Sequence, residues 1–574
     1  MERKRATMDG NHAAAHVAYF YTDVAAIYPI TPSSVMAEVA EAWAVEGRKN
    51  IFGNKVEISE MQAEAGAAGA VHGALTAGAL SSTFTASQGL LLMIPNLYKI
   101  AGEGLPGVFH VAARTVAAHA LSIFGDHSDI YACRQTGAAM LCESSVQEVM
   151  DLSPVAHCAA IEGRMPFINF FDGFRTSHEI QKISVWDEAD LRDLFPREAA
   201  EEFRKASPNP EHPCLMGQAQ NPDTYFQVRE ASNEHYNKIP ALVESYMKKV
   251  NDKIGTNYHL FNYYGASDAK HVIIAMGSVC ETIEEAVDYL ITKNEKVGMV
   301  KVHLYRPFCS EALVRVLPKA TETISVLDRT KEPGGAGEPL YLDVLAALKQ
   351  HNVEGIKVFR GRYGLSSKNT TPGQILAVFE NKDKKEFTIG IRDDVTNLSL
   401  EEKETPDNLN EKVYSCKFWG LGADGTVGAN KNSVNHTDLY AQAYFDYDSK
   451  KSGGLTVSHL RFGKHKIRSP YLVEKADFVA CHKPSYLWTY NMVQDVVSGG
   501  IFLLNCPWKP EEVEKHLPKQ VKRFIYEHHI QLYVIDGVKI GQETGMGTTR
   551  INTILQAAFF KLTNILPRMK GRDF

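Results

Sequence analysis

The sequence predicts a multidomain α/β protein. Its 574 residues are more than one hydrophobic core can use, so three or four domains are expected. From His271 onward, apolar runs typical of buried strands alternate with amphipathic helical patterns such as Thr282–Ile291. Strand–helix alternation at this spacing indicates a mainly parallel sheet. The predicted strands are 271–276, 297–304 and 323–327, and a further helix is predicted over 340–348.

Charge and cysteine content restrict the class of protein. The net charge of −6 argues against nucleic acid or an anionic membrane as the main partner, and no apolar run is long enough to span a bilayer. The charged N-terminal residues run into Asp9-Gly10-Asn11 without an apolar core, so no secretion signal is expected. The nine cysteines are widely spaced and include no C-x-x-C pair. They predict free thiols in a reducing compartment and no iron–sulfur ligand run.

Residues 24–30 form an apolar run that predicts a short buried strand leading directly into a helix. We expect Thr31 to be the N-cap, Pro32 to take the first helical position and Gly47 to end the helix. At the carboxyl end of a parallel strand, free backbone N–H groups offer a place for small anionic ligands. The alternative interpretation is that Thr31 only caps the helix.

A second helix is expected over residues 56–78. Glu57, Glu60 and Glu64 would crowd one face of this helix, which is mildly unfavourable unless a partner uses one of them. The remainder is almost entirely Ala and Gly, which permits close approach of another backbone or a flat ligand. A solvated acidic helix start remains an alternative for Glu57 and Glu60.

Arg114 follows a predicted buried strand over residues 108–112. If this strand lies in the sheet that carries Thr31, the planar guanidinium of Arg114 can face the same crevice and bind a carboxylate. A surface or ion-paired arginine is the alternative. The loop after it contains Asp126, His127 and Asp129, which are ligand-type residues, but a turn with side-chain caps is the preferred interpretation and no metal site is predicted.

Residues 382–412 are charged and indicate a boundary, after which a glycine-rich segment begins. Its glycines and Lys431 can form a backbone nest for a phosphate, whereas an ordinary glycine turn is the alternative. A second glycine loop over 541–547 precedes an apolar helix over 551–562, and Asn552 lies in the first turn of that helix.

Several of these motifs together resemble the 2-oxoacid:ferredoxin oxidoreductases, and most closely the pyruvate:ferredoxin (flavodoxin) oxidoreductases. The motifs, spread over essentially the whole chain, are Tyr28-Pro29-Ile30-Thr31-Pro32-Ser33-Ser34, Gly125-Asp126-His127-Ser128-Asp129, Arg134-Gln135-Thr136-Gly137, Ala219-Gln220-Asn221-Pro222-Asp223 and Gly422-Ala423-Asp424-Gly425-Thr426-Val427-Gly428. The resemblance implies oxidative decarboxylation of pyruvate to acetyl-CoA and CO2 with thiamine diphosphate, and electron transfer through [4Fe–4S] clusters to ferredoxin or flavodoxin.

The resemblance also implies three domains and a set of site residues. Residues 1–258 would form the pyrimidine-side thiamine diphosphate domain with a connecting segment, 259–415 a transketolase C-terminal-like domain, and 416–574 a Rossmann-like coenzyme A-binding domain, either whole or truncated. Glu64 would contact the aminopyrimidine ring, and Thr31 and Arg114 would hold the pyruvate carboxylate. The residues implied for coenzyme A are Gly422, Asp424, Gly425, Thr426, Val427, Gly428, Asn430, Lys431 and Asn552.

The sequence departs from the family where metal and clusters would be held. It has no ferredoxin-like cysteine run and no Gly-Asp-Gly motif followed by the Asn that holds Mg²⁺ and diphosphate. We therefore expect Mg²⁺ and the clusters only in a missing half, so that this chain is an N-terminal half or one subunit of a split enzyme and is inactive alone. A homodimeric full enzyme is expected, in the cytoplasm or a hydrogen-producing organelle. Another 2-oxoacid oxidoreductase subunit, or a non-catalytic protein of the same fold, remains an alternative.

Overall fold

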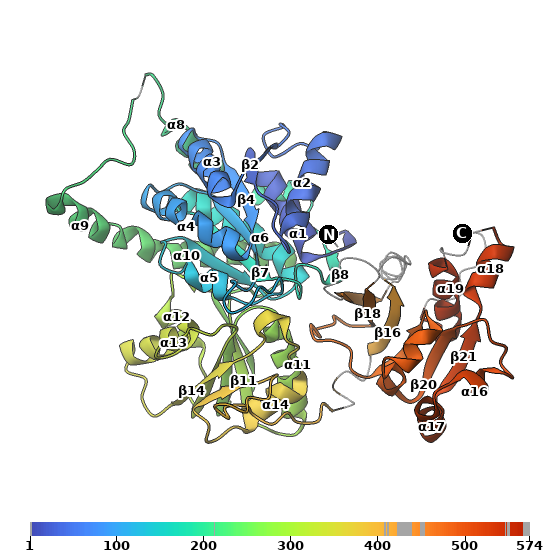
Figure 1. Ribbon diagram of the computed structural model, residues 1–574. Helices are drawn as coiled ribbons and strands as arrows, with labels where there is room; N and C mark the ends of the chain where they lie inside the picture. The colour runs from blue at the N-terminus through green and yellow to red at the C-terminus, as the bar shows by residue number, and fades with distance from the viewer. Residues whose placement is uncertain are drawn as a thin grey trace. The chain divides into compact units, whose positions relative to one another are not determined.

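The computed structural model describes residues 3–211, 213–406, 409, 413–421, 439–447, 454–545, 547 and 551–565. The chain divides into two compact units (Figure 1). The first holds residues 9–178 and 184–409 with the N-terminal residues up to 5, and the second holds 6–8, 179–183 and the chain after 409. The three-domain boundaries expected from the sequence stay a prediction. None of the helices in the described ranges is both long and apolar enough to cross a bilayer.

The first unit begins with a seven-stranded sheet in the order β12-β6-β7-β5-β4-β2-β3. Its strands are parallel except for the edge strand β12, which pairs antiparallel with β6. The strands are β2 (Val24–Ile27), β3 (Glu57–Glu60), β4 (Ser81–Thr85), β5 (Val108–Ala113), β6 (Ala139–Glu143), β7 (Phe167–Asp172) and β12 (Leu304–Arg306). Because β2, β4, β5 and β7 all point the same way, the residues that follow them gather at one edge of the sheet.

Helices pack around this sheet in groups. Helix α1 packs against α2 and α6, α6 also packs against α10, and α3 packs against α4. Their bounds are α1 (Gly10–Tyr21), α2 (Ser34–Glu46), α3 (Glu64–Thr76), α4 (Ser87–Gly102), α5 (Ser128–Ala132), α6 (Val146–Gly163), α7 (Glu188–Leu194), α8 (Arg197–Lys205), α9 (Pro222–Ala231) and α10 (Asn233–Ile254). Helix α9 has no buried residue and stands away from both sheets of its unit in Figure 1.

Two local predictions in this region are wrong. Helix α2 begins at Ser34 rather than at Pro32, because Thr31 to Ser33 form a turn in which Ser33 and Ser34 donate their backbone N–H groups to the carbonyl of Ile30 (2.9 and 3.0 Å). Thr31 is therefore not a helix cap. Residues 57–60 form the edge strand β3 instead of a helix, because they pair in parallel register with β2, and the helix starts only at Glu64. The predicted stop at Gly47 is confirmed by its left-handed φ of 87°.

A second sheet of the first unit has the order β15-β14-β13-β10-β11-β9, in which only the edge strand β9 is antiparallel. This confirms the parallel sheet predicted from the alternating pattern. The elements are β9 (Phe261–Gly265), β10 (His271–Ala275), α11 (Val279–Thr292), β11 (Val297–Val302), α12 (Ser310–Val316), β13 (Thr323–Asp328), α13 (Pro339–Gln350), β14 (Lys357–Arg362), a 3₁₀ turn η1 (Leu365–Ser367), α14 (Pro372–Glu380) and β15 (Glu386–Thr388).

Buried carboxylates join the ends of the two sheets. Asp172, the last residue of β7, contacts Arg329 Nη1 after β13 (2.6 Å) and accepts hydrogen bonds from the backbone and hydroxyl of Ser278 after β10 (2.9 and 2.5 Å). Asp328, the last residue of β13, accepts from the Tyr131 hydroxyl (2.8 Å) and from the backbone N–H groups of Leu340 and Tyr341 at the start of α13 (3.0 Å each). The carboxyl ends of both parallel sheets therefore meet inside this unit.

The second unit contains an eight-stranded mixed sheet in the order β1-β8-β17-β18-β16-β19-β20-β21. Strands β16, β19, β20 and β21 run parallel, as in the α/β domain predicted, whereas β17 and β18 add antiparallel strands. The strands are β1 (Arg5–Met8), β8 (Ile180–Ser184), β16 (Val413–Leu421), β17 (Tyr440–Tyr447), β18 (Leu455–Gly463), β19 (Ala476–Cys481), β20 (Val496–Asn505) and β21 (Gln531–Ile535), with helices η2 (Pro484–Trp488), η3 (Met492–Asp495), α16 (Val513–His516), α17 (Lys519–Glu527), α18 (Gly537–Glu543) and α19 (Asn552–Thr563).

The second predicted glycine loop is partly helical. Gly541 lies in α18, and a side chain is excluded there because a Cβ atom would lie 2.4 Å from the carbonyl oxygen of Gly547. Asn552 begins α19, as predicted.

Asp328→Asn tests the buried junction between the two sheets of the first unit. Burial raises the pKa of Asp328 from 3.8 to about 7, so between about pH 4 and 7 the folded protein holds a proton that the unfolded chain has released. This group's contribution to the free energy of unfolding must therefore fall as the pH rises through that window.

In Asp328→Asn that fall disappears, and loss of one accepted hydrogen bond costs about 1–2 kcal/mol at pH 5. Urea unfolding at pH 5 and pH 8 measures both effects. Asp223→Asn, on the exposed helix α9, is the matched control. The same loss of stability between pH 5 and pH 8 in Asp328→Asn and wild type would contradict this account of the junction.

Candidate active site

Thr31 and Arg114 lie together at the carboxyl edge of the first sheet. Arg114 directly follows β5 and is buried, and its Nη1 donates to the backbone carbonyl of Thr31 (2.8 Å). Thr31 itself is exposed in the turn after β2. The sequence-based expectation that these two residues face one crevice is therefore geometrically possible, although the bond uses the backbone of Thr31 and not its hydroxyl.

The guanidinium of Arg114 is oriented by the protein on one side. Its Nε donates to the carbonyl of Ser122 (3.3 Å), and within the described residues Nη2 has no hydrogen-bond partner. Burial lowers the pKa of Arg114, and the charge of Asp129 partly offsets this effect. A charged, planar group fixed at Nε and Nη1 still presents N–H donors to a carboxylate.

Asp129 holds the backbone on which Arg114 sits. Its Oδ2 accepts from the backbone N–H groups of Arg114 (3.0 Å) and Ser87 (2.7 Å), which follow β5 and open α4. Its Oδ1 accepts from Ile130 N (2.8 Å), and Asp126 likewise accepts from Ser128 N (2.9 Å). These contacts agree with the preferred interpretation of side-chain caps in this turn.

Two glycines let the strand ends approach closely. A Cβ atom at Gly173, after β7, would lie 2.3 Å from the carbonyl of Ala113 and 3.0 Å from Cγ of Pro32. A Cβ atom at Gly125 would lie 2.4 Å from the carbonyl of Gly173. The absence of side chains at these positions brings the turn after β2 and the end of β5 against the end of β7. Gly173 and Asp172 were not predicted from the sequence; a charged residue followed by glycine at the end of an apolar run was the available signal.

Glu64 lies in the first turn of α3, and its carboxylate packs next to Gly89 of α4. The residue is 8% exposed, and we find no hydrogen-bond partner for its carboxylate in the described part of the chain. A Cβ atom at Gly89 in α4 would lie 2.8 Å from Glu64 Oε1 and from the Thr85 hydroxyl, and that buried hydroxyl also lacks a partner among the described residues. Buried polar groups are nearly always hydrogen-bonded, so this unpartnered pair fits a ligand that supplies polar atoms.

The other predicted residues lie on different elements or outside the described residues. The coenzyme A residues from Gly422 to Lys431 lie outside the described residues, and Asn552 belongs to the second unit. Glu57 and Glu60 lie on the edge strand β3.

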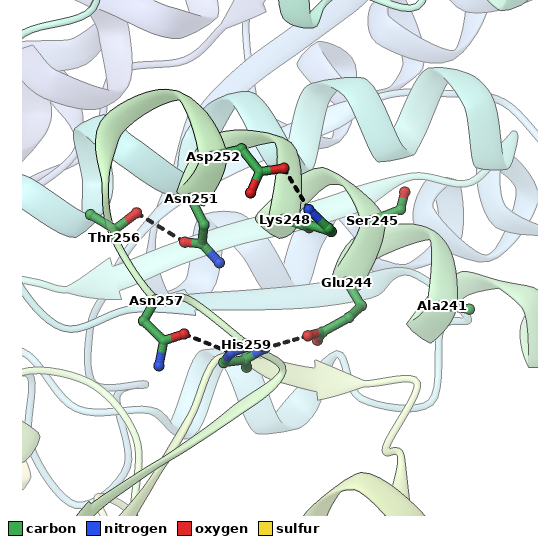
Figure 2. Close-up of a pocket in the computed structure, with 9 residues that line it drawn as sticks. All are labelled: Ala241, Glu244, Ser245, Lys248, Asn251, Asp252, Thr256, Asn257 and His259. Carbon is green, nitrogen blue, oxygen red and sulfur yellow. Dashed lines mark hydrogen bonds and ion pairs between the residues drawn. The ribbon is translucent and has the colours of Figure 1, made fainter.

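Figure 2 shows a surface pocket at the end of α10 that contains none of the predicted residues. Its polar side chains pair with each other: His259 with Glu244, Lys248 with Asp252 (2.6 Å), and Thr256 with Asn251 (2.9 Å). Because these groups are already satisfied, we locate the candidate active site at the strand ends and not in this pocket.

Comparison with known proteins gives matches along most of the chain. Three family descriptions match: "Pyruvate flavodoxin/ferredoxin oxidoreductase, thiamine diP-bdg" over residues 16–248, "Pyruvate:ferredoxin oxidoreductase core domain II" over 269–373, and "Pyruvate ferredoxin/flavodoxin oxidoreductase" over 415–573. The thiamine diphosphate-binding description covers Thr31, Glu64 and Arg114.

Relatives match over nearly the whole of this chain. It is 58% identical to pyruvate:ferredoxin oxidoreductase of Moorella thermoacetica over 98% of its length and 56% identical to pyruvate-flavodoxin oxidoreductase of Enterobacter agglomerans over 100%. It spans 48% and 50% of those two proteins, about half of their length.

A solved structure shares the fold. The 2-oxoglutarate:ferredoxin oxidoreductase of Magnetococcus marinus, solved with 2-oxoglutarate, coenzyme A and succinyl-CoA bound, superposes with a TM-score of 0.50 over 66% of this chain and 65% of its own, at 17% identity. With three family descriptions along its length and more than half of its residues identical to two such enzymes, the chain belongs to the pyruvate:ferredoxin/flavodoxin oxidoreductase family.

Proposed function

We propose that this chain supplies the substrate-carboxylate and pyrimidine-binding side of a pyruvate:ferredoxin or flavodoxin oxidoreductase. The observation that carries the proposal is the Arg114–Thr31 contact at the carboxyl edge of the first sheet. The unpartnered carboxylate of Glu64 lies on α3, which follows a strand of the same sheet. The names of the relatives support pyruvate as the substrate and ferredoxin or flavodoxin as the acceptor. The remaining half of the family's length is needed for the complete reaction.

Each residue has a separate role in this proposal. Arg114 and Thr31 bind and orient the carboxylate of pyruvate without consuming it, which fixes the position of the reacting carbonyl. Glu64 holds or donates a proton at its carboxylate toward a nitrogen of the aminopyrimidine, and the missing side chain at Gly89 leaves room for Glu64 to take this position. Thiamine diphosphate, when bound, supplies the carbanion chemistry that decarboxylates a 2-oxoacid.

Replacement of Arg114 tests the carboxylate site in an enzyme that contains both this chain and the remaining half. Arg114→Ala removes a charged bidentate donor and should lower kcat/KM for pyruvate. The loss should correspond to about 2–4 kcal/mol of transition-state stabilisation. Arg114→Lys keeps the charge without the planar fork and should fall between Ala and wild type. Thr31→Ala should cost about 1–2 kcal/mol in kcat/KM and leave the melting temperature unchanged, because Thr31 does not cap α2.

Steady-state kinetics with varied pyruvate measures these effects. Arg204→Ala is the matched control, because Arg204 pairs with Asp23 at the amino end of β2 (2.8 Å), away from the strand ends. Wild-type kcat and KM in Arg114→Ala would refute the assignment.

Glu64→Gln tests the proton-holding role. The variant keeps the shape of the side chain and loses the acid, so kcat should fall about 10²-fold or more while KM for pyruvate changes little. Exchange of the cofactor's reactive C–H with D2O should slow in parallel. Glu103→Gln on the far end of α4 provides the control, since Glu103 pairs with His72 and not with the site. Normal C–H exchange in Glu64→Gln would rule out this role.

We further propose that the second unit binds coenzyme A through residues Gly422 to Lys431, with Asn552 as an additional contact. The proposal is supported by the three glycines and the lysine of this segment, which lies outside the described residues. Coenzyme A should raise the melting temperature of the chain, and Lys431→Glu should reduce that increase. The control is Lys519→Glu at the start of α17. An equal increase in both variants would place the site elsewhere.

A further inference from the structure

The turn after β14 contains two consecutive serines in the left-handed conformation. Ser366 and Ser367 have φ angles of 56° and 54°, and Gly364 before them has a φ of 65°. A residue with a Cβ atom is disfavoured there because its Cβ crowds the following carbonyl oxygen. Such residues persist only where the surrounding contacts hold them, and they concentrate at functional sites.

The contacts that hold these serines go to the loop that follows Arg114. Ser367 donates its backbone N–H to the carbonyl of Gly125 (2.8 Å), and its hydroxyl accepts from the backbone N–H of Gly125 (2.8 Å). The hydroxyls of Ser366 and Ser122 are 2.6 Å apart. The turn is therefore hydrogen-bonded to the loop at Gly125 through a reciprocal pair of bonds and at Ser122 through a third bond.

The loop segment that is bonded to this turn also orients Arg114. The carbonyl of Ser122 accepts from Arg114 Nε (3.3 Å) and from the Thr115 hydroxyl (2.8 Å). The base of the loop closes where Thr115 N donates to the carbonyl of Phe124 (3.1 Å). Displacement of Gly125 or Ser122 would thus move the acceptor that fixes one side of the guanidinium.

The same turn is also hydrogen-bonded to residues around the end of β7. Arg175 Nη2 donates to the carbonyl of Ser367 (3.0 Å), and Arg329 Nε donates to the carbonyl of Gly364 (3.0 Å) while its Nη1 contacts Asp172. The turn therefore has bonds on both sides, to the Arg114 loop and to the buried Asp172 junction.

We propose that the Gly364–Ser367 turn of the second sheet is a positioning element for the substrate site, and that Ser367 acts through the Gly125–Ser122 segment to set the orientation of Arg114. The inference rests on the proposed role of Arg114 and adds to it a function for the second sheet of the first unit. Ser367 is a positioning residue and contacts no substrate.

Hydrogen exchange of this chain tests the grip without any substrate or cofactor. In Ser367→Ala the Gly125 N–H loses its acceptor, so exchange in residues 115–125 should quicken on the order of 10-fold, while α11 stays as protected as in wild type. Ser367→Gly removes the same hydroxyl and relieves the left-handed conformation, so it gives the measurement even if the Ala variant folds poorly. Ser310→Ala is the control, because the hydroxyl of Ser310 bonds to Gln350 and His351 and not to the loop.

A double-mutant cycle in the enzyme with both halves tests the action through Arg114. Ser367→Ala should raise KM for pyruvate roughly 5- to 10-fold with a smaller change in kcat, and should change kcat/KM less than about 2-fold when Arg114 is already Ala. Unchanged exchange in residues 115–125, or additive effects in the cycle, would overturn the proposal. Wild-type KM in Arg114→Ala would instead refute the role of Arg114, and with it the positioning function, whatever the exchange shows.

Discussion

The carboxylate of Asp172 lies where the carboxyl ends of two parallel sheets meet. It contacts His127 Nε2 (2.5 Å), Arg329 Nη1 and the backbone and hydroxyl of Ser278, which come from both halves of the first unit. Burial alone would raise the pKa of Asp172, but Arg329, His127 and the hydrogen bonds outweigh it and hold the pKa well below its usual value. A buried ion in this position is tolerable only when every partner is present, so the junction fixes the separation of the strand ends.

The geometry of the candidate site depends on this junction. Gly173 and Gly125 bring the backbone after β7 and β5 into contact, and Arg329 carries the constraint on to the turn that grips the loop after Arg114. The side chain proposed to bind substrate is thus held through backbone atoms of both sheets. Such support keeps a guanidinium within the narrow range of orientations that carboxylate binding requires.

Polar satisfaction distinguishes Glu64 from the buried aspartates Asp129, Asp172 and Asp328 of the same unit. Asp129, Asp172 and Asp328 each accept several hydrogen bonds or ion contacts within the protein. Glu64 and Thr85 pack against Gly89 and have no partners among the described residues. The contrast is what a ligand-binding surface requires, because groups that are satisfied inside the protein cannot recognise a ligand.

The sequence alone determined the α/β class, the parallel second sheet and the family, because periodicity, turn residues and long motifs are local properties of the chain. It also identified Thr31 and Arg114 as candidates from their positions at strand ends, and Glu64 from the resemblance to the family. It could not determine that residues 57–60 form a strand, since pairing with β2 overrides the helical spacing of the glutamates. Only the tertiary structure decided which polar groups form hydrogen bonds within the protein. It also placed Ser367 next to Gly125, 242 residues away in the chain, because that contact depends on how two sheets pack and on no pattern near either residue.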